Sequence, residues 1–445
     1  MAGTLTNLQL RHFVIDARVA IITSNFSPER TGIGQVTTEF ARFLSAEGIE
    51  VRVATAFPYY PEWRIYPGYE GSLWREEHLG DIRVLRAWHH ASVAPGAFSR
   101  IAHELTLCLL SIPNIVRALR GAGTAYIVSP DLSLAWVASV IAGAMRKRRV
   151  LFVQDVMPDA AIEMGMLRNR TLIAISRRIA RALYATSDEI YTLGNGMRRR
   201  IGVATAAPDK IRIVPNTIDP SELAPTPRET NRFRKQFVTD GKFAVVHAGN
   251  MGEKQNLPLL LRAAALLRDE TDIEFFVIGD GAVKDAFLRQ KAEMALDNVT
   301  HLGFLDRELL PEMLSGADVF LVSQVPKAVD IVVPSKLVTA MGAGAMIVAA
   351  CAPGSETGEI VSVSGGGITT SPEDEAELVR GILSIREGKV DTARCRRSAR
   401  DYAVKHFSRR EVYGPIADSL RAAAGETTAP RRADAVSASR GAALD

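Results

Sequence analysis

Short apolar runs that alternate with amphipathic helical segments are the feature that most constrains how this chain folds. The first run covers 18–24. A glycine-containing loop follows it, then a helical segment that begins near Val36 and ends at Gly48, and then a second apolar run at 50–56. Runs of this length are typical of buried strands, and strands that alternate with helices favour a parallel sheet covered on both faces. The sequence therefore predicts an α/β fold.

The same alternation occurs twice along the chain. Prolines between 215 and 227 interrupt the pattern, and an apolar run at 243–248 followed by a glycine turn restarts it. With 445 residues the chain is also longer than one hydrophobic core usually serves. We therefore predict two Rossmann-like, doubly wound parallel sheets in separate domains. Further strand candidates lie at 82–85, 125–128, 150–153, 189–192 and 211–214 in the first half, and at 274–278, 299–302, 319–322 and 347–350 in the second.

The pattern also predicts where the domains begin and end. The boundary falls in the proline-rich stretch, and the last residues are polar and rich in Pro, Gly, Ala and Ser, a composition typical of disorder. The predicted segments are an N-terminal extension at 1–17, a first domain at 18–218, a second domain at 219–404, a C-terminal helix at 405–424 and a disordered tail at 425–445.

Composition argues against several classes of protein. The formal net charge is only +4, so a nucleic-acid partner is not required. The three cysteines lack the spacing of a zinc site or a disulfide framework, which fits a reducing cytoplasm. No segment resembles a signal peptide or a spanning helix, and the longest apolar stretch, 105–112, is broken by Pro113 and is expected to be part of a buried or interfacial helix. We expect a cytoplasmic protein that is neither secreted nor integral to a membrane.

Each half has a glycine loop between a strand and a helix. The first contains Thr31, Gly32 and Gly34, and the second contains Gly249 and Gly252. Such loops let backbone N–H groups approach a phosphate at the positive end of a helix dipole. Neither loop is a complete dinucleotide fingerprint, and the first could be a tight turn only. Two such loops nevertheless indicate a diphosphate ligand.

Polar side chains accompany the second loop and a later helix start. Asn250, Lys254 and Gln255 add amides and a cation to the loop, and Gly279 follows the next strand. Lys336 lies in the first turn of a helix that Pro-Ser begins, where a cation is unfavourable unless an anion binds nearby. The alternative for both lysines is an ordinary solvated side chain.

Two segments of the first half are candidates for binding the second substrate. The loop 57–63 is rich in aromatic residues, which can stack on sugar rings or simply pack the loop. Asp155 follows the strand candidate at 150–153, where a carboxylate can serve catalysis, although capping of a helix is the alternative.

Basic residues cluster in the same half of the chain. A helix expected at 170–184 has apolar residues on one face and arginines on the other, and further basic runs lie at 146–149 and 198–200. A basic amphipathic helix can rest on an anionic membrane, and a solvated basic face is the alternative. The chain has no HExxH, GxSxG or P-loop pattern and no residues spaced as a metal-ligand cluster.

Seven segments, in order, carry a resemblance that extends from about Arg18 to Phe407. They are SPERTGIG, EVRVATAFPYYPEWR, VQDVMPD, IRIVPN, GNMGEKQNL, FFVIGDG and VVPSKLVTAMGAG. Together they resemble glycosyltransferase family 4, and specifically the colanic-acid-type fucosyl and N-acetylfucosaminyl transferases of exopolysaccharide and O-antigen synthesis.

The resemblance implies a GT-B fold, a retaining reaction and no catalytic metal. It implies that the second domain binds a nucleotide-sugar donor, that the first binds a lipid-linked saccharide acceptor, and that the last helix returns to the first domain. Catalytic roles are expected for Lys254, Gln255, Lys336 and Asp155. Donor contacts are expected from Gly32, Gly34, Gly249, Asn250, Gly252, Gly279, Ser335, Leu337 and Thr339.

The chain departs from the broad family at a pair of glutamates with seven residues between them. Thr339 stands where the second is expected, and Ile331, beside Asp330, where the first would be. We interpret this as chemistry of the subgroup. Two alternatives remain. An NDP-sugar epimerase shares the fold, but the sequence shows no His/Glu/Asp acid–base cluster to serve it. A non-catalytic sugar-nucleotide binder would account for the missing glutamates.

Overall fold

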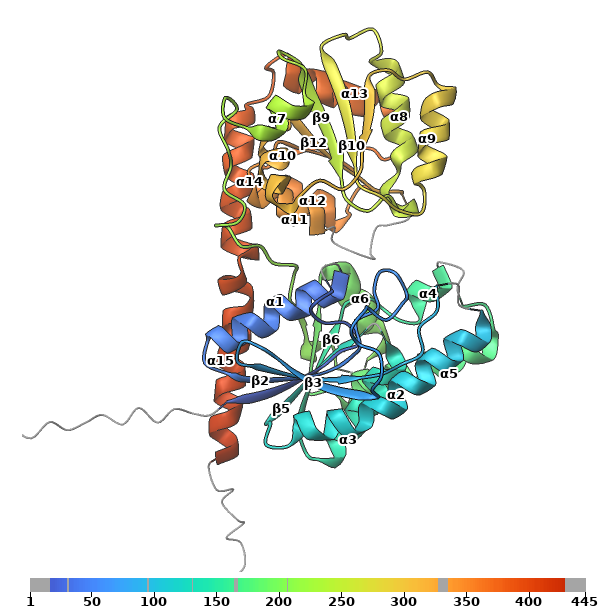
Figure 1. Ribbon diagram of the computed structural model, residues 1–445. Helices are drawn as coiled ribbons and strands as arrows, with labels where there is room; N and C mark the ends of the chain where they lie inside the picture. Colours follow the sequence, from blue (N-terminus) through green and yellow to red (C-terminus); the bar gives the residue numbers. More distant parts are fainter. Residues whose placement is uncertain are drawn as a thin grey trace, which may run out of the picture. The chain divides into compact units, whose positions relative to one another are not determined.

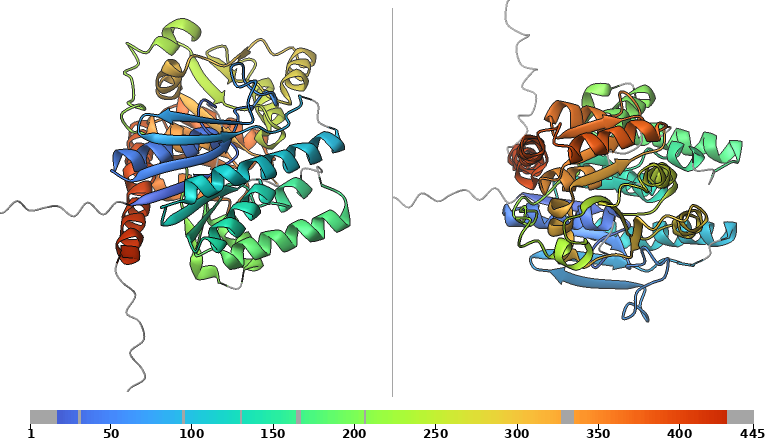
Figure 2. Two further views of the ribbon diagram at one scale, coloured as in Figure 1. Left: turned by 60° about the horizontal axis from the view of Figure 1, so that its bottom comes forward. Right: turned by 90° about the horizontal axis from the view of Figure 1, so that it is seen from above.

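The computed structural model describes residues 17–29, 32–93, 96–129, 131–163, 167–205, 207–326 and 335–428. It contains an eight-stranded and a six-stranded sheet, each with helices on both faces (Figures 1 and 2). Both sheets are α/β, as the sequence predicts.

The first sheet has the strand order β3-β4-β2-β1-β5-β6-β7-β8. β1 lies in the middle and pairs in parallel with β2 and β5, which explains why its residues 19–22 are all buried. β3 is the exception to the parallel prediction, because it pairs antiparallel with β4. Its sequence WREEHL is polar and largely exposed, which is typical of an edge strand and explains why the apolar pattern missed it. The strands are β1 Arg18–Ile22, β2 Glu50–Ala56, β3 Trp74–Leu79, β4 Ile82–Ala87, β5 Thr124–Ser129, β6 Arg148–Val153, β7 Glu189–Thr192 and β8 Ile211–Ile213.

The helices between these strands follow the predicted alternation. The apolar stretch 105–112 is part of a helix, as expected, and α2 continues through Pro113 to Leu119. A proline lacks the N–H that would bond one turn back, but the rest of this 23-residue helix remains intact. The helices are α1 Gly32–Ala46, α2 Ala97–Leu119, α3 Leu132–Ala144, α4 Asp159–Glu163, α5 Arg170–Thr186 and α6 Asn195–Ala204, with a short 3-10 helix η1 at Pro208–Lys210.

The second sheet has the order β11-β10-β9-β12-β13-β14, and each strand pairs in parallel with its neighbours. Successive residues of β9 and β10 enter different cores: Val246 and Phe276 pack on one face, Val245 and Phe275 on the other. Both faces are therefore buried, which is why these strands read as continuous apolar runs. The strands are β9 Phe243–Ala248, β10 Ile273–Ile278, β11 Val299–Leu302, β12 Val319–Ser323, β13 Ile347–Ala350 and β14 Gly367–Thr370.

Helices flank this sheet and lead to the end of the chain. Among the described residues, every helix is too short or too polar to cross a bilayer. The helices are α7 Arg232–Phe237, α8 Leu257–Leu266, α9 Lys284–Glu293, α10 Leu310–Gly316, α11 Ser335–Gly342, α12 Glu356–Ser364, α13 Glu375–Arg386, α14 Thr392–Phe407 and α15 Arg409–Thr428, with 3-10 helices η2 Glu253–Gln255 and η3 Arg307–Leu309.

By compactness the chain divides into residues 1–150 with 415–445, and residues 151–414. Within the first of these units, Arg421 donates a hydrogen bond to the backbone oxygen of Glu47, and Arg148 donates one to the Ser419 hydroxyl. α15 extends four residues past the predicted helix end, and the rest of the predicted tail lies outside the described residues. The domain limits drawn from the sequence stay a prediction.

Candidate functional site

The ends of β9 and β10 meet backbone to backbone at two glycines. Gly249 donates its N–H to the Ile278 oxygen over 2.9 Å. A Cβ on Gly279, whose φ is +133°, would lie 2.1 Å from the Gly249 carbonyl oxygen. No side chain fits in that space, so the sequence needs glycine here. The close approach fixes the second glycine loop at the carboxyl edge of the sheet.

The rest of this loop is tied to the neighbouring strands by its backbone. Met251 is buried and donates its N–H to the Asp280 oxygen over 2.8 Å. The Lys254 oxygen accepts the Val325 N–H over 3.1 Å, and the Gln255 oxygen accepts the Ser323 hydroxyl over 2.5 Å. The loop is therefore rigid at its base, while Asn250 beside it is exposed.

Lys336 of α11 reaches the same loop. Its Nζ lies 2.5 Å from Gln255 Oε1 and 3.3 Å from His247 Nε2. His247 Nδ1 lies 3.1 Å from the Leu321 oxygen, so this nitrogen carries the proton and Nε2 accepts from the lysine. A Cβ on Gly249 would lie 3.6 Å from Nζ, which places the ammonium directly beside the glycine turn. The structure thus brings three predicted residues together and adds His247, which the sequence analysis missed.

The electrostatics of this group favour an anionic ligand. Burial lowers the pKa of Lys336 to about 7, and burial together with the neighbouring lysine lowers the pKa of His247. Among the residues that the structure describes, neither Lys336 nor Lys254 forms an ion pair with a carboxylate. The nearest partners of the Lys336 ammonium are neutral, so a bound phosphate would supply the countercharge.

The first turn of α11 presents backbone N–H groups beside Lys336. Ser335 begins the helix, and Thr339 donates its hydroxyl to the Ser335 oxygen over 3.0 Å. The Leu337 side chain is fully buried in the core, so only its backbone is available to a ligand. Asp330 and Ile331, where the first family glutamate would fall, lie outside the described residues.

α14 holds α11 in place from the other end. Arg400 donates hydrogen bonds to the Gly342 oxygen, to the Leu223 oxygen over 2.8 Å and to the Pro220 oxygen over 3.1 Å. A guanidinium at a helix C-terminus satisfies carbonyls that the helix itself leaves unpaired. Lys336 is thus positioned by a helix that is fixed by its apolar face and its C-terminal end.

The first glycine loop has a different chemistry. α1 begins at Gly32, and a Cβ on Gly34 would lie 3.1 Å from Glu29 Oε2. Glu29 Oε1 accepts the N–H groups of Tyr59 and Tyr60 over 2.8 and 2.9 Å. Gly34 therefore packs on a buried carboxylate that anchors the aromatic loop. Thr31 lies outside the described residues, and the donor roles of Gly32 and Gly34 stay predictions.

Asp155 lies two residues beyond the end of β6, as the sequence predicts. Burial raises the pKa of its carboxyl group. Gln154 beside it is buried, and no hydrogen-bond partner is found for its Nε2 among the described residues. A carboxyl group at a strand end with a raised pKa is suited to handling a substrate proton, but its catalytic role stays a prediction.

The structure also gathers three residues that sequence reasoning did not connect. His103 and Glu104 of α2 and Asp131, directly before α3, bring one donor atom each to within 4.8 Å of one another. The statement that the chain has no His/Glu/Asp cluster is therefore wrong. Asp131 is 27 positions from Glu104 in the sequence, so spacing could not reveal the group. The only available signal is that Asp131, like Asp155, follows a strand.

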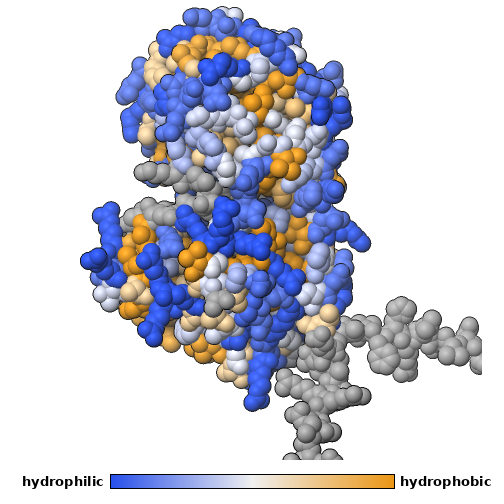
Figure 3. Space-filling model, turned by 180° about the vertical axis from the view of Figure 1, so that it is seen from behind, coloured by the Kyte–Doolittle hydropathy of each residue, from blue (hydrophilic) through white to orange (hydrophobic). Residues whose placement is uncertain are grey.

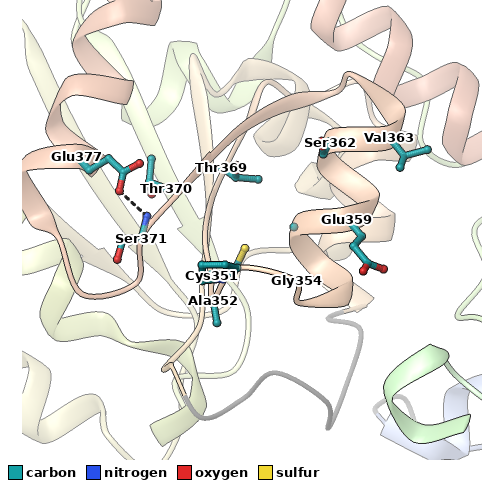
Figure 4. A pocket seen from close by; sticks show the side chains of 12 residues that line it. Cys351, Ala352, Gly354, Glu359, Ser362, Val363, Thr369, Thr370, Ser371 and Glu377 are labelled. Atoms are coloured by element: carbon teal, nitrogen blue, oxygen red, sulfur yellow. Dashed lines mark hydrogen bonds between the residues drawn. The ribbon is translucent and has the colours of Figure 1, made fainter. Parts of the chain in front are cut away.

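A pocket of about 470 Å³ opens elsewhere in the second sheet, between the ends of β13 and β14 and α12 (Figure 4). Glu377 accepts the Ser371 N–H over 2.8 Å at one side, and Glu359 lies at the other. Its lining residues include two carboxylates and neither lysine nor arginine. Such a lining repels a diphosphate, so this pocket is not a candidate for the donor phosphates.

The predicted basic amphipathic helix is present as α5. Leu172 and Ile175 are 52% and 49% exposed, and Arg177 pairs with Asp159 over 3.1 Å. On the face drawn in Figure 3, hydrophobic residues form separate patches within a mostly hydrophilic surface. Membrane contact by this helix stays a prediction.

Two domain families match the chain. Residues 31–217 match the family described as glycosyl transferase 4-like domain, and residues 242–387 match glycosyl transferases group 1. The chain is 28% identical over 416 residues to WcaI of Escherichia coli (strain K12), a glycosyl transferase named for colanic acid biosynthesis, and the match covers 91% of this chain and 100% of that one.

Solved structures confirm the fold. Sucrose-phosphate synthase from Thermosynechococcus elongatus superimposes with a TM-score of 0.67 at 15% identity, covering 91% of this chain and 98% of that one. HepE from Anabaena in complex with UDP gives 0.66 at 16% identity, covering 91% and 100%. The two sheets therefore have the GT-B fold, as the sequence predicts.

Proposed function

Because its two halves match two glycosyltransferase domains, we propose that this protein is a retaining transferase of bacterial exopolysaccharide, capsule or O-antigen synthesis. It moves a sugar, fucose or a related deoxy or acetamido sugar, from an NDP-sugar to a hydroxyl of a lipid-linked oligosaccharide. The observation that carries the proposal is the half-buried Lys336 ammonium beside Gly249, in contact with Gln255 and His247, which are both neutral.

The donor diphosphate lies against the second glycine loop in this proposal. As the bond between the sugar C1 and the phosphate oxygen breaks, negative charge grows on the departing diphosphate. Lys336, Lys254 and the backbone N–H groups at Gly252 and the first turn of α11 stabilise that charge more than they stabilise the ground state, which lowers the barrier.

The acceptor hydroxyl attacks C1 from the face that the phosphate leaves. Its oxygen forms the new bond to C1, and its proton passes to the departing phosphate oxygen, so the anomeric configuration is retained. Asp155 orients the acceptor. No metal is assigned to this transfer, because lysine and backbone donors take the role of charge stabilisation.

The nucleotide is the least determined part of the donor. The HepE structure contains UDP, which supports testing UDP-sugars alongside GDP-sugars. The acceptor is lipid-linked, so the transfer takes place at the inner face of the cytoplasmic membrane. Leu172, Ile175 and the arginines of α5 would contact anionic lipid there.

The test begins with thermal shift of the purified protein in UDP, GDP and their sugar conjugates, since a ligand that binds the folded state raises its melting temperature. Transfer is then measured with the donor that binds. Lys336→Ala and Gln255→Ala should each lower turnover at least about tenfold while the fold is kept, because Lys336 stabilises the charge and Gln255 accepts a hydrogen bond that positions its ammonium. Lys291→Ala, on α9, is the matched lysine control. Wild-type rates in both site variants would refute the placement of the donor.

An NDP-sugar epimerase is the second candidate, because His103, Glu104 and Asp131 supply the acid–base groups that such a reaction needs. Release of free epimerised sugar without an acceptor would support the epimerase. Donor binding with neither transfer nor hydrolysis would instead indicate a non-catalytic binder.

A further inference from the structure

Three side chains of the first compact unit converge at the carboxyl end of β5. His103 and Glu104 come from the first half of α2, and Asp131 stands between β5 and α3. One donor atom from each lies within 4.8 Å of the other two. An imidazole and two carboxylates at this separation combine nitrogen and oxygen ligands in one place.

His103 is held in the tautomer that metal-binding histidines adopt. Its Nδ1 lies 2.8 Å from the His90 backbone oxygen and donates to it. The lone pair is then on Nε2, the nitrogen left to ligate an ion. The side chain is only 7% exposed. A backbone carbonyl that accepts from Nδ1 is the usual outer support of a histidine that ligates through Nε2.

The two carboxylates meet near the start of α3, and Asp131 does not cap that helix. Asp131 occupies the N-cap position of α3, yet its side chain makes no capping hydrogen bond. Glu104 accepts a hydrogen bond from Ser133 of the same helix α3, which fixes its direction. Burial and the neighbouring Asp131 raise the pKa of Glu104, so the two acids are in each other's field. Like charges this close need a shared proton or a cation.

We propose that His103, Glu104 and Asp131 bind a first-row divalent cation such as Zn²⁺ or Mn²⁺. Three atoms within 4.8 Å of one another lie at most about 2.8 Å from a common centre, and Zn²⁺ binds nitrogen and carboxylate oxygen at roughly 2.0–2.2 Å. Each donor atom thus has to move by less than about one ångström. Mixed N and O ligands favour these ions over Ca²⁺ and Mg²⁺, which prefer oxygen alone.

The ion would join α2 to the start of α3, since its ligands come from both elements. It takes no part in the sugar transfer proposed above, which relies on Lys336 and the second glycine loop. It would also occupy the groups that an epimerase needs as free acid and base, so binding of the ion argues against that second candidate.

The experiment titrates ZnCl₂ and MnCl₂ into the chelator-stripped full-length protein by calorimetry, with MgCl₂ and CaCl₂ as comparisons. We expect one Zn²⁺ or Mn²⁺ per chain with a micromolar or tighter Kd, a higher melting temperature and reversal by chelator. Glu104→Gln and Asp131→Asn keep the side-chain shape and should each weaken binding at least tenfold. His103→Gln should do the same.

His78→Gln is the matched control, because His78 is exposed on β3 and contributes nothing to the cluster. It should leave the ion affinity unchanged. The wild-type titration tests the proposal even if a variant does not fold. Failure of Zn²⁺ and Mn²⁺ to bind below millimolar concentration overturns it, and so does binding that Glu104→Gln and Asp131→Asn leave intact.

Discussion

Replacing Lys336 by methionine should remove the pH dependence of nucleotide binding between pH 7 and pH 8.5. Burial lowers the pKa of this lysine to about 7, so the free protein carries the ammonium in about half of its molecules at pH 7. At pH 8.5 the charged fraction falls to about 3%. The phosphates of a nucleoside diphosphate are already ionised above pH 7, because their last pKa is about 6. The lysine therefore dominates the change in this window.

The size of the effect is set by these fractions. If only the ammonium form binds the diphosphate tightly, the Kd for UDP or GDP rises about 16-fold from pH 7 to pH 8.5 in the wild type. Binding at pH 8.5 is accompanied by uptake of nearly one proton. The Lys336→Met variant should bind weakly at both pH values with a flat profile, and Lys336→Arg should bind with a flat profile because its guanidinium keeps its charge.

Calorimetry in two buffers of different ionisation enthalpy measures both the Kd and the proton uptake. Gln255 and His247 remain in each variant, so the comparison isolates the charge. A wild-type Kd that changes less than twofold over the window would refute the reasoning. A Lys336→Met variant that kept the same pH dependence would assign the titration to another group.

Four further changes should have measurable effects on stability. Between pH 7 and 10.5 the unfolded chain binds more protons at Lys336 than the folded chain, so this lysine adds a contribution to wild-type stability that rises with pH. The Lys336→Met variant should therefore have a higher free energy of unfolding in urea near pH 7, by up to about 4 kcal/mol. A variant that is less stable than the wild type would contradict this. Gly279→Ala should lower the free energy of unfolding by about 3 kcal/mol or more, because the added Cβ would lie 2.1 Å from the Gly249 oxygen. A decrease of less than about 1 kcal/mol would show that the turn relaxes. Arg400→Met should lower the free energy of unfolding by about 2–3 kcal/mol, because it leaves the Gly342 and Leu223 oxygens unpaired. Arg410 is exposed, so Arg410→Met is the control in the same unfolding assay and should change stability little. Burial raises the pKa of Glu29, so its favourable contribution to stability is present below the unfolded pKa of 4.5 and is lost as pH rises through the folded pKa. The melting temperature of Glu29→Gln at pH 7 should therefore equal or exceed that of the wild type, and any such gain should vanish in acid. A lower melting temperature of the variant at pH 7 would show that the carboxylate itself is needed.

Periodicity predicted the fold because these strands are buried on both faces. Glu50–Ala56 and Glu189–Thr192 were placed with their observed bounds, since an apolar run of strand length between turn residues is typical of a buried strand and too short for a helix. Trp74–Leu79 was missed because an edge strand keeps polar side chains.

The candidate site was only partly visible in the sequence. Lys336 and Gln255 drew attention through the turns beside them, but nothing local indicated that they meet over 2.5 Å. His247 read as one more residue of a buried strand, and its role depends on Leu321 of the adjacent strand. Side chains that meet through strand order or through the packing of a helix on a strand end, as in the His103 cluster, have no signature in linear spacing.

The two bonds from the chain's last helix to Glu47 and Arg148 have a consequence for biosynthesis. The partners of these groups, Arg421 and Ser419, leave the ribosome at least 271 residues after Arg148 does. A nascent chain therefore cannot complete its first unit until the whole second unit has been made, even though domains generally fold in order from the N-terminus. A nonsense mutation anywhere between residues 150 and 415 would consequently leave the first unit unfinished, even though the sequence up to residue 150 is intact.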